Sequence, residues 1–144
     1  MNEKQAKDFR EKIRILERKL GLLKKNNGSI NKNTLTLPQC HSLIEIGRAE
    51  KISLKNLSKI LSIDISTTSR TVESLVKKEY VIRTTSSEDR RSVDIYLSES
   101  GKLLFNEIES EMDNYFSEIF SRIPQNEKGN VLTALDTILK AFNN

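Results

Sequence analysis

The chain has 144 residues, of which 36% are hydrophobic and 31% are charged, and its formal net charge is +4. This length suffices for one domain with a sizeable core, and no run of about 18 apolar residues is present to span a membrane. The N-terminal residues are charged where a secretion signal needs an apolar core, so we expect a cytoplasmic protein. A single cysteine, Cys40, excludes an internal disulfide framework.

Charge is distributed unevenly along the chain. Residues 1–32 hold ten basic and four acidic residues, whereas residues 98–144 hold four basic and eight acidic residues. Opposite charges favour packing of the two ends against one another, but charge runs are more often solvated helix faces.

Two helices are predicted first. Residues 3–25 place apolar side chains three and four positions apart, as on one helical face, and the polar run 26–29 ends this pattern. Pro38 suits the first turn of a second helix at about 37–48. The apolar side of that helix holds Cys40, Leu43, Ile44 and Ile46.

Two short helices joined by a tight turn follow. Ser53 is a predicted N-cap of the first, whose expected buried residues are Leu54, Leu57, Ile60 and Leu61. Asp64 is a predicted N-cap of the second, at about 65–78. This second helix has an apolar side with Val72, Leu75 and Val76, and a polar side with Ser66, Thr67, Ser69, Arg70 and Glu73.

A β-hairpin is predicted at about 80–97. Residues 80–85 are rich in β-branched and aromatic side chains, and residues 92–97 alternate between polar and apolar ones. The polar residues between these strands include Asp89, Arg90 and Arg91, which we expect at the hairpin tip.

The chain is predicted to end in two helices. Ser98 is the expected N-cap of a long helix at about 98–122, with apolar residues at heptad-like spacing, and Pro124 separates it from a last helix at about 125–142. The spaced residues of the long helix are Leu104, Ile108, Met112, Tyr115, Ile119 and Ile123.

This order of elements indicates a winged helix–turn–helix, a mainly α fold with a small β-hairpin wing. The second helix of the pair fits the DNA major groove, and arginine at a hairpin tip suits the narrow, electronegative minor groove. Two alternatives stay open: the Ser and Thr residues lie on a solvated face, or the wing binds an acidic protein partner.

Residues 57–104 resemble the multiple-antibiotic-resistance regulator (MarR) family of bacterial repressors. The similarity is carried by Asp89–Arg90–Arg91–Ser92–Val93, by Leu97–Ser98–Glu99 and Gly101, and by residues 35–47, which resemble the family's second helix. The resemblance implies a winged helix–turn–helix at 35–97, flanked by dimerisation helices at 1–34 and 98–144. It also implies a homodimer that binds a pseudo-palindromic operator in double-stranded DNA and is released by a small effector.

The resemblance assigns roles to the predicted site. Asp89 would orient Arg91 into the minor groove, and Arg90 would be a second contact. The groove-facing residues would be Ser66, Thr67, Ser69 and Arg70, whereas Thr68 would pack inward. Two positions depart from the family pattern. Glu79 stands where glycine is common, which predicts a differently shaped connection to the wing, and Ser74 stands where arginine is common, which predicts one phosphate contact fewer.

Cys40 and His41 are the candidate sensor residues. An imidazolium beside a thiol stabilises the thiolate, so a redox-sensing repressor that uses Cys40 is one hypothesis. Neighbouring helix positions diverge by about 100°, however, and the apolar neighbours of Cys40 favour a packing role. Aromatic and Met residues of the long helix are candidates for a ligand pocket or, more simply, for a dimer core.

No catalytic site, cofactor site or metal site is predicted. One histidine and one cysteine are too few for a zinc site, and the sequence has no glycine-rich phosphate loop and no triad spacing. We therefore expect a protein that is not an enzyme.

Overall fold

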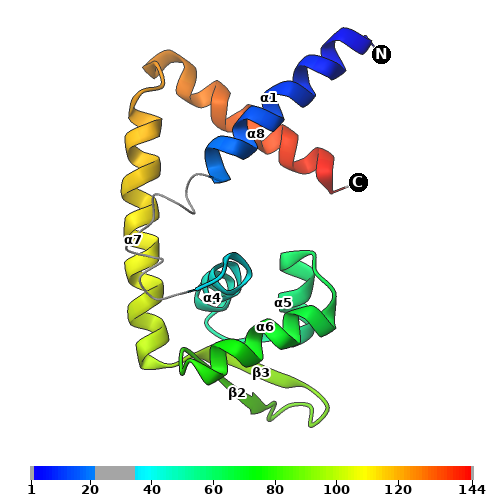
Figure 1. Ribbon diagram of the computed structural model, residues 1–144, viewed down its shortest axis with the longest axis vertical. Coiled ribbons are helices and arrows are strands. Elements are labelled where there is room, and N and C mark those ends of the chain that lie inside the picture. The colour runs from blue at the N-terminus through cyan, green and yellow to red at the C-terminus, as the bar shows by residue number, and fades with distance from the viewer. Residues whose placement is uncertain (1, 22–34, 144) are drawn as a thin grey trace. The chain divides into compact units, whose positions relative to one another are not determined.

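The computed structural model describes residues 2–21 and 35–143. Figure 1 shows its elements in chain order. They are α1 (Glu3–Gly21), α4 (Leu37–Ala49), β1 (Ile52–Ser53), α5 (Leu54–Leu61), α6 (Ile65–Lys77), β2 (Val81–Thr85), β3 (Val93–Leu97), α7 (Glu99–Ser121), the 3₁₀ turn η1 (Gln125–Glu127) and α8 (Lys128–Phe142). The chain forms two compact units, one ending at Phe105 and the other starting at Asn106, so their boundary falls inside α7.

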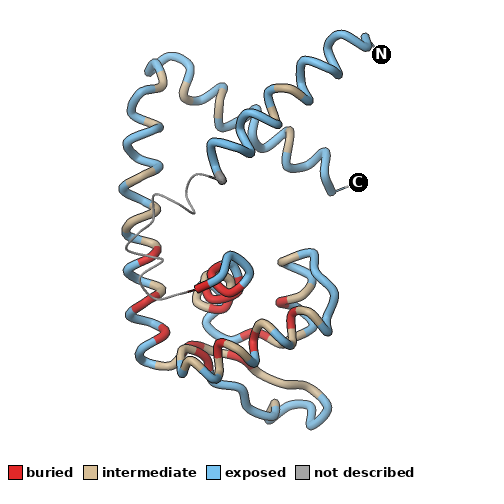
Figure 2. The backbone as a smooth tube through the Cα atoms, in the orientation of Figure 1, coloured by how far each residue is buried: buried red, intermediate tan, exposed pale blue. Residues whose placement is uncertain are grey.

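The buried core of the first unit lies between three helices and a small sheet. Helices α4, α5 and α6 pack against one another, and α4 and α5 also contact β3. Figure 2 shows buried positions on these elements. Side chains without exposed surface are Leu43, Ile46, Leu57, Val72, Leu75 and Ile95. This is the predicted winged helix–turn–helix, mainly α with a β-hairpin wing.

The sheet has three antiparallel strands in the order β1-β3-β2. Strands β2 and β3 form the predicted hairpin, in which Val81 pairs with Leu97 and Thr85 with Val93. Strand β1 was not predicted, because two residues are too few to show an alternating pattern. It pairs Ile52 with Ile95 and so places the start of α5 beside the wing.

The predicted helix caps are confirmed. The Ser53 side chain accepts a hydrogen bond from the Asn56 amide at 3.1 Å, and the Asp64 carboxylate accepts one from the Thr67 amide at 3.0 Å. The Ser98 hydroxyl accepts one from the Gly101 amide at 3.1 Å, at the start of α7. These bonds satisfy backbone donors that a helix leaves unpaired in its first turn.

Three expectations need correction. Ile60, expected in the core, is 53% exposed, because the inward side of α5 is centred on the buried Leu57, with Leu54 and Leu61 partly buried, and Ile60 lies beyond one edge of it. The last helix begins at Lys128, after the η1 turn, and not at 125. Glu79 has a φ of 67°, so α6 ends in the left-handed conformation, and the connection does not change shape there as the loss of glycine predicted.

The remaining helices keep much of their apolar surface exposed. On α1, Phe9, Leu16 and Leu20 are 42–50% exposed, while the part of the predicted helix beyond Gly21, including Leu23 and the run 26–29, lies outside the described residues. On α7, Leu104 and Ile108 are buried, but Ile119 further along the heptad pattern is 37% exposed. On α8, exposed apolar side chains are Leu132, Leu135, Leu139 and Phe142. Within the described ranges, no helix has the length and apolar character needed to cross a membrane.

Candidate nucleic-acid interface

The first turn of α6 is organised by the Asp64 carboxylate. This carboxylate accepts hydrogen bonds from the Ser66 hydroxyl at 2.5 Å, the Thr67 amide at 3.0 Å and the Thr67 hydroxyl at 2.8 Å. The hydrogen bond from Ser66, followed by those from Thr67, holds the pKa of the Asp64 carboxyl well below its usual range. Asp64 is therefore ionised at neutral pH and fixes the direction of both hydroxyl hydrogens.

The predicted groove-facing residues lie on the accessible side of α6. Ser66 and Arg70 are exposed, and Thr67 and Ser69 are partly buried. An Arg70 guanidinium nitrogen donates to the Thr67 hydroxyl oxygen at 3.3 Å. Thr68 is 1% exposed and its hydroxyl donates to the Asp64 carbonyl at 3.0 Å, which confirms that this residue packs inward.

A buried glutamine on α4 connects that helix to α6. The Gln39 amide nitrogen donates to the Ser74 hydroxyl at 2.9 Å. The Gln39 side-chain oxygen accepts from the Thr36 amide at 2.9 Å and from the Lys78 ammonium at 3.1 Å. Ser74 stands where arginine is common in the family that the sequence resembles. Here it is a partner of Gln39, and its hydroxyl donates to the Thr71 carbonyl at 2.6 Å. These bonds fix α6 relative to α4.

Gln39 was not among the predicted site residues, although the sequence holds a signal for it. Thr36 and Gln39 have the spacing of a capping box, and both reciprocal hydrogen bonds of that motif are present at the start of α4. The capping box predicts the local turn. It does not predict that the same amide also reaches Ser74, 35 positions further along the chain.

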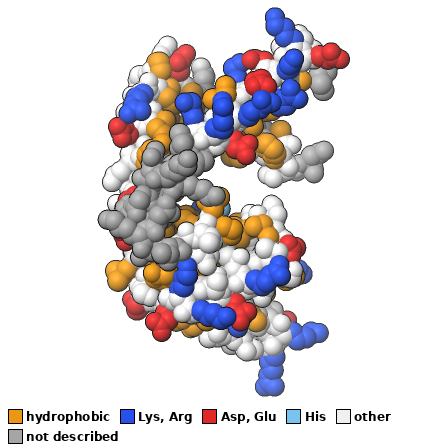
Figure 3. Space-filling model, viewed as in Figure 1, with side chains coloured by type: hydrophobic (Ala, Val, Ile, Leu, Met, Phe, Trp, Pro, Cys, Tyr) orange, Lys and Arg blue, Asp and Glu red, His pale blue; other side chains and the backbone are white. Residues whose placement is uncertain are grey.

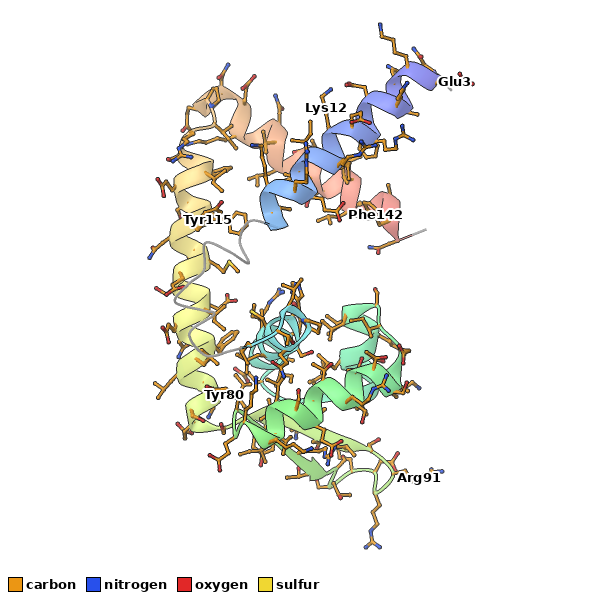
Figure 4. The ribbon with its side chains drawn as sticks, in the orientation of Figure 1. Glu3, Lys12, Tyr80, Arg91, Tyr115 and Phe142 are labelled. Carbon is orange, nitrogen blue, oxygen red and sulfur yellow. The ribbon has the colours of Figure 1, made fainter. Side chains whose placement is uncertain are left out.

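The wing carries its two arginines at the hairpin tip. The Arg91 side chain is 94% exposed, its Nε lies 3.7 Å from Asp89 Oδ1, and its backbone amide donates to the same oxygen at 3.0 Å. Arg90 is also exposed. Figure 4 shows Arg91 at the end of the hairpin farthest from α4 and α6, and Figure 3 shows basic side chains projecting there. The expected pairing of Asp89 with Arg91 is therefore present.

The end of α6 is bonded to the start of α7. The Glu79 carbonyl accepts hydrogen bonds from the Ser98 hydroxyl at 2.6 Å and the Ser100 hydroxyl at 2.9 Å. The Tyr80 carbonyl accepts one from the Ser98 amide at 3.0 Å. A left-handed non-glycine residue costs on the order of 1 kcal/mol, and these bonds offset that cost at Glu79.

The candidate sensor residues are not brought together. Cys40 is buried, and burial raises the pKa of its thiol, whereas the neighbouring His41 is exposed on another side of α4. A raised pKa keeps the thiol protonated and unreactive, which supports the packing interpretation. No group of three or more His, Cys, Asp or Glu residues in the described part of the chain is arranged to hold a metal ion.

Comparison with known proteins places this site in a family. Residues 35–93, which span α4 to the start of β3, match the MarR family. The HTH-type transcriptional regulator SarZ of Staphylococcus haemolyticus is 30% identical over 118 residues, which cover 82% of this chain and 79% of the relative. The chain belongs to the MarR family. Its membership in a family of transcriptional regulators agrees with the sequence prediction of a regulator and not an enzyme.

Solved structures of MarR-family fold extend the likeness to almost the whole chain. Streptococcus pneumoniae FabT in complex with DNA superposes with a TM-score of 0.77 at 19% identity, over 98% of this chain and 99% of FabT. A Staphylococcus aureus MepR–DNA complex superposes with a TM-score of 0.78 at 19% identity, over 93% of this chain and 97% of MepR. The MarR fold is therefore shared well beyond the winged helix.

Proposed function

We propose that this MarR-family protein is a homodimeric, sequence-specific DNA-binding repressor that acts in the cytoplasm. The observation that carries the proposal is the wing tip, where the Arg91 side chain is almost fully exposed, with its Nε 3.7 Å from Asp89 Oδ1 and its backbone amide bonded to the same oxygen. An exposed arginine at a hairpin tip suits entry into the minor groove, where the potential is most negative when the groove is narrow. Arg90 supplies a second positive charge beside it.

Helix α6 is the proposed recognition helix. Its accessible side presents Ser66, Thr67, Ser69 and Arg70, which are side chains that bond phosphates or base edges. The segment 53–78 holds five basic and two acidic residues, so its charge favours DNA. Gln39 fixes this helix relative to α4, because it bonds Ser74 and Lys78 near the end of α6.

The proposed dimer uses residues 1–34 and 98–144. The support comes from the exposed apolar side chains on α1, α7 and α8, which a second copy of the chain would remove from water. A dimer with two-fold symmetry presents two recognition helices and two wings to a pseudo-palindromic operator, with half-sites about one helical turn apart.

A small effector would release the operator by changing the separation of the two recognition helices, because the duplex fixes the half-site spacing. The alternative switch, oxidation of Cys40, has weaker support, since the thiol is buried and its pKa is raised. The alternative partner of the wing, an acidic protein, is tested by the experiment that follows.

The test measures DNA affinity by fluorescence anisotropy. Duplexes selected from a random pool by the purified protein give the preferred site, and a scrambled duplex gives the non-specific affinity. We expect a preference of about a thousandfold or more and a steep loss of affinity as salt rises.

Arg91→Ala is the decisive variant, and Arg122→Ala is its matched control. Arg122 is also an exposed arginine in a surface ion pair, with Glu118 at 2.9 Å, but it lies in the turn that follows α7. We expect Arg91→Ala to weaken specific binding about 5–150-fold and to lower the salt slope by about one, while Arg122→Ala has little effect. Equal affinities of the two variants would refute the wing assignment and favour a protein-binding wing.

A further inference from the structure

Two isoleucines at the start of α6 are exposed to solvent. Ile65 is the first residue of the helix and is 51% exposed, and Ile63 in the preceding turn is 38% exposed. Large aliphatic side chains stabilise a protein when they are removed from water, so these exposed isoleucines beside the polar surface of α6 contribute little to the stability of the fold. Ile65 therefore offers apolar surface to whatever α6 binds.

The position of Ile65 selects its partner. Recognition helices of the helix–turn–helix type contact base edges with their N-terminal residues. Ile65 directly precedes Ser66 and Thr67 and lies at that end of α6. The apolar group that a major groove offers to a side chain is the 5-methyl group of thymine.

The neighbouring Ser66 hydroxyl points to the same base pair. Its hydrogen is donated to Asp64, so its oxygen is left as an acceptor, whereas the Thr67 oxygen, which also donates to Asp64, already accepts from Arg70 at 3.3 Å. The Ser66 oxygen can accept a hydrogen bond from the amino group of adenine or of cytosine. Of the standard base pairs, A·T is the one that offers an amino donor and a methyl group together in the major groove.

We propose that Ile65 is a specificity-determining residue that reads a thymine 5-methyl group in each half-site, beside the Ser66 acceptor oxygen, which suits the paired adenine. This inference rests on the proposed DNA-binding function of α6. It is more specific than that function, because it assigns one base pair to one side chain.

The test replaces thymine with uracil, which removes the methyl group alone. Each thymine of the selected site is replaced in turn, in both half-sites, and affinity is measured for the wild type, Ile65→Ala and Ile60→Ala. Ile60 is the matched control, because it is an isoleucine on the neighbouring helix α5 and is 53% exposed. Both isoleucines are exposed, so melting temperatures close to that of the wild type verify that the variants are folded.

We expect one thymine position at which uracil weakens wild-type binding about fourfold per half-site, or roughly fifteenfold for both. Ile65→Ala should bind the thymine and uracil duplexes equally at that position, whereas Ile60→Ala should keep the full uracil penalty. This non-additivity is the signature of a direct contact between the side chain and the methyl group.

Three results would overturn the inference. If uracil carries no penalty at any position, or if Ile65→Ala keeps the wild-type penalty, Ile65 does not read a thymine methyl, although specific DNA binding by the wild type stands. If the wild type does not distinguish the selected site from scrambled duplex, both the inference and the proposed function fail.

Discussion

Replacing Gly101 with alanine should destabilise the junction between the wing and α7. A β-carbon at Gly101 would lie 2.0 Å from the Tyr80 carbonyl oxygen and 3.3 Å from the Leu97 β-carbon. The first of these is a backbone atom, and it already accepts a 3.0 Å hydrogen bond from the Ser98 amide. The start of α7 must therefore move away by an ångström or more, and the bonds from Ser98 and Ser100 to Glu79 weaken with it.

The magnitude follows from these contacts. Overpacking costs about 1–3 kcal/mol, and loss of a hydrogen bond costs about 1 kcal/mol more, so the free energy of unfolding should fall by about 2–4 kcal/mol. For a chain of this size that corresponds to a fall of roughly 5–15 °C in Tm. The assay is thermal unfolding followed by circular dichroism at one fixed protein concentration, because a dimer's Tm depends on concentration.

Two other glycines provide matched comparisons, Gly129 as the control without a clash and Gly47 as a clash with a side chain. Gly129 lies in the first turn of α8 with no atom within 4 Å of its β-carbon position, so Gly129→Ala should leave Tm unchanged or raise it slightly. At Gly47 the new β-carbon would meet the Phe105 ring at 2.5 Å, and a side chain can move more easily than backbone, so an intermediate fall is expected. A Gly101→Ala protein as stable as Gly129→Ala would refute this reasoning.

Three further predictions concern Asp64, Cys40 and Gln39. Asp64→Ala should lower Tm at pH 7. Because the folded pKa of Asp64 is depressed, its stabilising contribution is present above its unfolded pKa and is lost as the pH falls from about 4 toward the folded value. The Tm difference between this variant and the wild type should therefore shrink in acid, and a constant difference would contradict the assignment. Mass spectrometry should show that Cys40 resists mild peroxide in the native protein and reacts once the protein is unfolded. DNA affinity should be unchanged after this treatment. Formation of sulfenic acid at Cys40 in the native protein would support the redox alternative. Gln39→Leu should cost about 1–3 kcal/mol in chemical denaturation, because Ser74 and Lys78 lose a buried partner. Gln39→Glu should recover part of this loss by accepting from Lys78, although it cannot donate to Ser74, whose own hydrogen is bonded to the Thr71 carbonyl; equal stability of the two variants would mean that the bridge is unimportant.

Local patterns in the sequence determined the elements of this protein and the chemistry of its proposed site. The helices and the hairpin could be predicted from helical spacing, from N-cap residues at 53, 64 and 98, and from the alternation after Ser92. Each of these signals depends on neighbours within a few residues. The pairing of Asp89 with Arg91 could be predicted for the same reason, since two positions separate them.

Tertiary structure decided the features that depend on distant residues. Strand β1 exists because Ile52 and Ser53 meet β3. Ile60 is exposed because the neighbours of α5 cover only the side through Leu57. Gln39 bridges two helices through partners 35 and 39 positions away. Glu79 keeps a left-handed conformation because hydroxyls about 20 positions further on bond its carbonyl. Propensity describes a residue with its chain neighbours, whereas these outcomes depend on which hydrogen-bond partners and apolar surfaces the folded chain brings near.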